Sequence, residues 1–192
     1  MPQNYLALDL ELNVDSEGKT TKIIQVGIAV GSEVDNIKTY KWYVDPKEPI
    51  VPYITELTGI TQEDINTKAV SLSQVAVELG QIIDEHQTFV NPIQWGGGDA
   101  EELMEEFKQN QVEFRYFGHR AIDVKTLFVF FQMAKGNSWK GGLRACMGRY
   151  KLHFSGEPHR ADVDAYNTLL FYFHLMNRQT KMEQIVRMAK DL

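Results

Sequence analysis

The chain has 192 residues, 43% of them hydrophobic, which suffices for one core, and no linker rich in proline, glycine or serine divides it. We therefore expect a single domain spanning residues 1–192. The formal charge of −6 argues against a protein that coats nucleic acid by bulk charge, and the lone Cys146 excludes a disulfide framework or a thiolate metal site. With no leader sequence or membrane-spanning run visible, we expect a soluble, cytoplasmic protein that does not bind membranes.

The first stretch of interest is the apolar run from Tyr5 to Leu12, which contains Asp9 and Glu11. Side chains alternate along a strand, so a strand here places both carboxylates on one face. Two acids side by side among leucines repel each other and are costly to bury, which favours a divalent cation between them. The alternative is a solvated strand end. About one Asp-x-Glu pair is expected by chance, and a second one, Asp15 and Glu17, lies in a polar turn ending at Gly18.

The remaining pattern alternates between strand and helix periods. We expect Pro49 and Pro52 to shape an irregular loop, and Thr61 and Asp64 to cap a short helix. The predicted strands cover residues 22–30, 39–44, 89–95 (irregular or at an edge) and 114–117. The predicted helices cover residues 71–86, 99–109, 122–134, 141–150 and 160–176, with a short helix after the last. This order predicts an α/β fold, a single-domain mixed β-sheet flanked by helices on both faces.

Asp99 follows three glycines and opens a predicted helix. It suits an ordinary N-cap, with Glu102 three residues on. The glycines also allow the backbone to approach a neighbour closely, which favours a ligand site at the strand end. Both interpretations stay open.

His159 and Asp164 form the last candidate pair. Of the five histidines, His159 alone has an aspartate five positions later, where about 0.3 such pairs are expected by chance. Side chains five positions apart on a helix point in directions about 140° apart, so both residues could not face one site from within a helix. We therefore expect His159 in the loop before the last long helix and Asp164 in its first turns. The loop at 156–158 would let His159 swing into a site. An ordinary surface histidine is the alternative.

Taken in order, Asp9-x-Glu11, Asp99 and His159-x4-Asp164 resemble the DEDDh family of 3′-to-5′ exonucleases, which belongs to the ribonuclease H-like superfamily and includes ribonuclease T and polymerase proofreading subunits. The run Leu57-Thr58-Gly59-Ile60-Thr61 looks like the segment of this family that receives the terminal nucleotide. The stretches from Lys140 to Leu143 and from Asp164 to Thr168 look like members that act on small RNA and histone mRNA.

The resemblance implies a metal-dependent enzyme that hydrolyses single-stranded DNA or RNA from its 3′ end. Two Mg²⁺ or Mn²⁺ ions would be held by the four carboxylates, and His159 would be the general base. The residues implied for the terminal nucleotide are Leu10, Leu12, Leu57 and Thr58.

Other functions stay open at this point, among them a module that grips 3′ ends without cutting and a subunit that docks a polymerase or nuclease. No residue chooses between DNA and RNA. The runs Phe130-Phe131 and Phe171-Tyr172-Phe173 place more apolar side chains on their helices than one buried face of each helix needs. A homodimer that covers the remaining apolar surface is therefore a possible assembly. Residues 99–106 are acidic and residues 135–160 basic, an asymmetry that could carry phosphates toward the acids.

Overall fold

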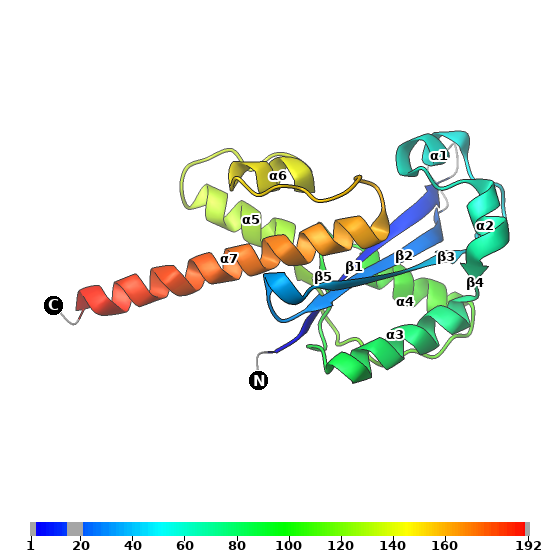
Figure 1. Cartoon of the computed structure of the whole chain (residues 1–192), viewed down its shortest axis with the longest axis horizontal. Coiled ribbons are helices and arrows are strands. Elements are labelled where there is room, and N and C mark those ends of the chain that lie inside the picture. The colour runs from blue at the N-terminus through cyan, green and yellow to red at the C-terminus, as the bar shows by residue number, and fades with distance from the viewer. Residues whose placement is uncertain (1–2, 15–20, 191–192) are drawn as a thin grey trace.

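A mixed sheet of six strands, in the order β4-β3-β2-β1-β5-β6, organises the chain (Figure 1). The first three strands pair antiparallel, and the other three pair in parallel with their neighbours. The strands are Tyr5–Val14 (β1), Thr21–Gly31 (β2), Lys38–Val44 (β3), Ala69–Val70 (β4), Ile93–Gln94 (β5) and Ile122–Asp123 (β6). The computed structural model describes residues 3–14 and 21–190. The predicted turn with Asp15 and Glu17 lies outside them.

Helices cover both faces of the sheet, as predicted (Figure 1). They are Pro52–Thr58 (α1), Gln62–Lys68 (α2), Leu72–His86 (α3), Asp99–Gln109 (α4), Val124–Met133 (α5), Leu143–Arg149 (α6) and Ala161–Lys190 (α7), with a 3-10 turn at Val34–Asn36. None of the helices in the described ranges is both long and apolar enough to cross a bilayer.

Alternation along β1 divides the molecule into two cores. Leu6, Leu8 and Leu10 pack with α3 and α4, whereas Ala7 faces a second core built from α5, α6 and α7. Since odd-numbered side chains of β1 share the second face, Asp9 and Glu11 point toward the α7 side of the sheet.

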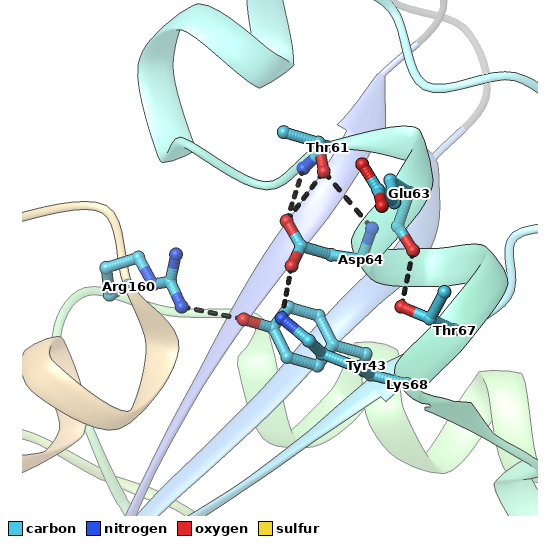
Figure 2. Close-up of polar contacts among 7 residues, drawn as sticks. All are labelled: Tyr43, Thr61, Glu63, Asp64, Thr67, Lys68 and Arg160. Atoms are coloured by element: carbon cyan, nitrogen blue, oxygen red, sulfur yellow. Dashed lines mark hydrogen bonds and ion pairs between the residues drawn. The ribbon is translucent and has the colours of Figure 1, made fainter.

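The segment after β3 contains a helix, so the predicted irregular loop is wrong there. Pro52 occupies the first turn of α1, where its missing N–H would have no intrahelical partner. Gly59 ends the helix in a left-handed conformation, with φ of 68°. The predicted capping box of α2 is confirmed: the Thr61 N–H donates to Asp64 Oδ2 over 3.0 Å, and the Asp64 N–H donates to Thr61 Oγ1 over 3.1 Å (Figure 2).

Two strand predictions differ from the structure. The strand expected at 89–95 shrinks to β5, which lies between β1 and β6 and not at an edge. The strand expected at 114–117 does not form. Phe114 is buried instead against Phe107, with ring centroids 5.3 Å apart. Aromatic residues favour strands because strands offer packing surface, and here a loop supplies that packing.

The last helix is continuous. α7 runs from Ala161 to Lys190 without the predicted break after Met176, and its C-terminal half projects beyond the sheet (Figure 1). Phe171, Tyr172 and Phe173 are all buried, because this part of α7 packs on the sheet and beside α5 and α6. These three side chains therefore offer no surface to a second copy, whereas Phe130 is 65% exposed.

Candidate active site

Asp9 and Glu11 stand on the central strand of the sheet, beneath the start of α7. Glu11 is only 8% exposed and Asp9 is partly buried. Across the ladder, Asp9 faces Gly27 and Glu11 faces Gln25 on β2. The two carboxylates therefore lie on the wall that the N-terminus of α7 approaches.

α7 and the loop before it bring Asp164 and His159 to this wall. Asp164 lies in the first turn of α7, and its Oδ2 accepts a hydrogen bond of 2.8 Å from the backbone N–H of His159. His159 has a left-handed backbone, with φ of 62°. Metal-binding atoms of Glu11, His159 and Asp164 all lie within 4.8 Å of one another. Residues separated by about 150 positions in the sequence thus meet at a distance that a single cation could span.

Close packing of β2 against α7 explains this convergence. A Cβ at Gly27 would overlap the Ala161 carbonyl and the Asp162 nitrogen, so only glycine allows the helix to start here. Beside it, the fully buried Gln25 accepts a hydrogen bond of 2.9 Å from the Ala161 N–H. This side chain satisfies one of the free N–H groups at the start of α7 and fixes the helix over Glu11.

The loop that carries His159 is also held in place. Asn167, fully buried on α7, accepts from the Ser155 N–H and donates to the Ser155 carbonyl, each over 2.9 Å. Arg160 donates a hydrogen bond of 2.7 Å to the Tyr43 hydroxyl on β3 (Figure 2). His159 therefore lies on a loop anchored on both sides of the residue, although its own side chain is exposed.

Asp99 reaches the same region from the end of β5. Gly98, with φ of 119°, is the N-cap of α4 and Asp99 is the first helical residue, so the N-cap interpretation of Asp99 is wrong. The N-terminus of α4 is instead satisfied by Gln94, whose Oε1 accepts from the Ala100 N–H over 3.0 Å. Burial, followed by the charge of Glu101, raises the pKa of Asp99 to about 7, and hydrogen bonding from the Leu10 backbone opposes the rise.

Negative charge is crowded around Asp9 and Glu11, whose pKa values are raised by burial and by the neighbouring acids. Burial raises the pKa of Asp9 well above its ordinary value, and the other three acids add to the rise. Burial, then the charges of Asp164 and Asp99, raise the pKa of Glu11 to about 8, while Arg160 opposes this. Burial also raises the pKa of Asp164. Such crowding of negative charge is typical of a cation site.

Asp9, Glu11, His159 and Asp164 line a cavity of about 720 Å³, and Asp99 is not among its lining residues. The cavity is also lined by residues of α6, Arg144 among them, and by the aromatic residues Trp95 and Phe154. Nothing in the sequence pattern pointed to Phe154 as a neighbour of the acids, whereas Arg144 belongs to the basic stretch 135–160 that we expected to carry phosphates toward them. Gln25 did carry a signal, since it is the one polar residue in the apolar run from Ile23 to Val30.

Of the four residues expected to hold the terminal nucleotide, only one lines the cavity. Leu10 lines the cavity, although it also packs in the opposite core, whereas Leu12, Leu57 and Thr58 do not line the cavity. Thr58 is buried, and its hydroxyl donates to the Ile54 carbonyl over 2.8 Å and accepts from the Ile60 N–H. Leu57 is 38% exposed at the end of α1. The structure thus brings the acids and His159 together but leaves these three residues outside the cavity.

The mixed sheet, with acids on its central strand and a histidine before the last helix, is a ribonuclease H-like exonuclease fold. The profile of the exonuclease family represented by ribonuclease T matches residues 6–172. The chain therefore belongs to this exonuclease family.

Solved structures share the fold at low sequence identity. The nuclease domain of 3'hExo, a DEDDh family member bound to rAMP, superimposes with a TM-score of 0.77 at 15% identity, covering 92% of each chain. Cell-death related nuclease 4 superimposes with a TM-score of 0.79 at 19% identity, covering 92% of this chain and 65% of that one. Exonuclease I of E. coli in complex with a dT13 oligonucleotide superimposes with a TM-score of 0.71 at 15% identity, covering 95% of this chain and 43% of that one.

Curated relatives are considerably longer than this chain. The 3'-5' exonuclease DinG of Bacillus subtilis is 23% identical over 177 residues, which are 92% of this chain and 18% of DinG. A protein of Arabidopsis thaliana whose name describes a small RNA degrading nuclease is 31% identical over 97 residues, 47% of this chain and 29% of that protein. The chain thus spans less than a third of the length of either relative.

Proposed function

We propose that the chain is a metal-dependent 3′-to-5′ exonuclease that hydrolyses single-stranded DNA or RNA and releases nucleoside 5′-monophosphates. One observation carries the proposal: Asp9, Glu11, Asp164 and His159 line a single cavity in a chain of the exonuclease family, and Asp99 lies near enough to raise the pKa of Asp9 and Glu11. The solved relatives named with rAMP and with dT13 support a 3′-terminal nucleotide as the cavity's ligand.

The donor set fits hard divalent cations. Carboxylate oxygens are the ligands that Mg²⁺ and Mn²⁺ prefer, and the only cysteine is buried in the second core. Asp9, Glu11, Asp99 and Asp164 would hold two ions, which would relieve the repulsion that raises their pKa. When bound, such ions supply a nucleophile at neutral pH and stabilise the leaving oxygen.

The protein's own residues perform the other tasks. His159, next to Glu11 and Asp164, accepts the proton of the attacking water, the general base role that a histidine side chain takes most often. Trp95 and Phe154 offer apolar surface in the cavity to a nucleotide base. Removal of nucleotides from a chain end, rather than cleavage at internal bonds, is supported by the match to the exonuclease family.

Two labelled oligonucleotides test the proposal. With Mg²⁺, a 5′-labelled strand gives a ladder that shortens by single nucleotides, and a 3′-labelled strand releases a labelled mononucleotide in the first turnover. A strand with a blocked 3′ end serves as the control and stays intact. An internal cut would contradict the exonuclease assignment, and binding without any cleavage would favour a 3′-end-binding module.

A further inference from the structure

Positive charge is concentrated on the helices of the second core. Residues 124–160 and 165–189 contain ten lysines and arginines and two glutamates, in a chain with a formal charge of −6. No ion pair between residues of the described ranges involves any of these ten cations. This half of the molecule therefore presents cations that are not neutralised by its own acids.

Two of these cations lie near the end of α6, in a group that we call the Tyr150 cluster: Lys135, Tyr150, His174 and Arg178. Lys135 Nζ lies 5.3 Å and Arg178 Cζ 5.8 Å from the centroid of the Tyr150 ring, and the His174 ring packs edge-on at 5.3 Å. Gln132 fixes the ring by donating to its hydroxyl over 2.9 Å. Cation–π contacts thus hold two like charges near each other.

These like charges repel within the cluster. The pKa of Lys135 is lowered by burial and then by Arg178, and the pKa of His174 is lowered by burial and then by Arg178 and Lys181. Among residues 3–14 and 21–190, no carboxylate pairs with Lys135 or Arg178, so an added anion would relieve the repulsion.

α6 links the Tyr150 cluster to the active-site cavity. Arg144 and Ala145 in its first turn line the cavity, and Tyr150 follows its last residue. The helix lies beside the first half of α7, which carries Asp164 at one end and His174 and Arg178 further along (Figure 1). His174 and Arg178 follow Asp164 by ten and fourteen residues of α7, about 15 and 21 Å along the helix axis, a distance that several nucleotides of a single strand can span.

We infer that the Tyr150 cluster binds the phosphodiester backbone of the strand whose 3′ end lies in the cavity, several nucleotides upstream of that end. The identity of this anion rests on the proposed function. Arg149 takes no part, since it donates to the carbonyls of Ser138 and Lys140 and so folds the loop before α6. An acidic protein segment would match the charge, but continuity with the cavity favours a nucleic acid strand.

A pair of charge reversals tests the inference. The test variant is K135E/R178E. The control is K108E/R115E, which changes the net charge by the same amount but lies in α4 and the loop after it, on the other side of the sheet. Thermal melting checks that both variants fold. Values of kcat/KM are measured with Mg²⁺ for a dinucleotide and for a 16-nucleotide strand. For K135E/R178E we expect at least a tenfold loss on the long strand and less than a twofold change on the dinucleotide. The control changes neither by more than twofold.

The salt dependence gives a second readout. Loss of two phosphate contacts lowers the slope of log affinity against log salt by about 1.4, at about 0.7 per contact for single strands. If K135E/R178E lowers kcat/KM equally for the two substrate lengths, the inference is overturned. If it changes kcat/KM for neither substrate, the inference is also overturned, and an acidic protein is the better candidate for the occupant. If the wild type cleaves neither substrate, the proposed function fails. In that case the inference is tested separately, by fluorescence anisotropy with the labelled 16-nucleotide strand. An affinity of K135E/R178E equal to that of the wild type overturns the inference.

Discussion

Gly27 on β2 lies in direct contact with the backbone of Ala161, the first residue of α7, and leaves no room for a side chain. Because Gly27 is also the cross-strand partner of Asp9, the same residue sets the distance between the acids of β1 and those of α7. The site therefore depends on a position that carries no functional group.

The variant Gly27→Ala should move the start of α7 away from the sheet. Overpacking against backbone costs about 1–3 kcal/mol or more, so we expect a lower denaturation midpoint together with a loss of activity. Urea titration and oligonucleotide cleavage measure the two effects. Gly148→Ala is the control, since a Cβ there meets nothing within 4 Å and helix propensity favours alanine. Equal midpoints for Gly27→Ala and the wild type would contradict the packing argument.

Glu11→Gln should abolish cleavage and yet stabilise the metal-free protein at alkaline pH. The folded pKa of Glu11, about 8, is raised above the ordinary value of 4.5, so its stabilising contribution is complete below about pH 4.5 and is lost as the pH rises through 8. The glutamine carries no charge and escapes this loss. Denaturant titrations in EDTA at pH 5, 7 and 9 should therefore show a difference in stability that grows with pH, to the order of a few kcal/mol at about 1.4 kcal/mol per pKa unit. A constant difference across this range would refute the charge-crowding explanation.

His159→Ala should lower the rate by about 10²–10⁴, the range of general base catalysis, while the metal-induced rise in melting temperature persists. The reason is that the four carboxylates are retained. Cleavage rates and thermal melting with and without Mg²⁺ measure the two effects. A variant that keeps the wild-type rate would remove the general base role, and one that loses the metal-induced shift would make His159 a metal ligand.

Arg160 should tune the pH profile of the site. Its charge lowers the pKa of Glu11, so Arg160→Met should raise that pKa and move the acidic limb of the kcat/KM profile to higher pH. Tyr43→Phe is the matched control, because it removes the hydrogen bond to Arg160 but keeps the ring and the positive charge. An equal displacement of the profile in both variants would assign the effect to the position of the loop and not to charge.

Local patterns in the sequence predicted most of the elements. Alternation along β1 placed two acids on one face, and the capping box at Thr61 marked the start of α2. The first error came from Pro52, which was interpreted as a helix breaker although proline fits the first helical turn. The second came from α7, where apolar periodicity fades after Met176 but the helix continues.

The surroundings of the acids could not be predicted in the same way. Phe154 and Arg144 reach the cavity through the path of the loop after α6 and the position of α6 itself, which depend on tertiary packing. Gly27 and Gln25 act through contacts with α7, more than 130 positions later in the chain. Sequence spacing selects residues with suitable chemistry, whereas the contacts that hold them in place arise from packing between distant segments.

Asp9 and Asp164 lie 155 positions apart, on the first strand and the last helix. During synthesis, a ribosome-bound chain that has not yet released α7 carries three of the acids but neither Asp164 nor the anchored His159 loop. The acid cluster therefore cannot assemble on a nascent chain until the segment that carries Asp164 has emerged and packed against β1, whatever follows that segment.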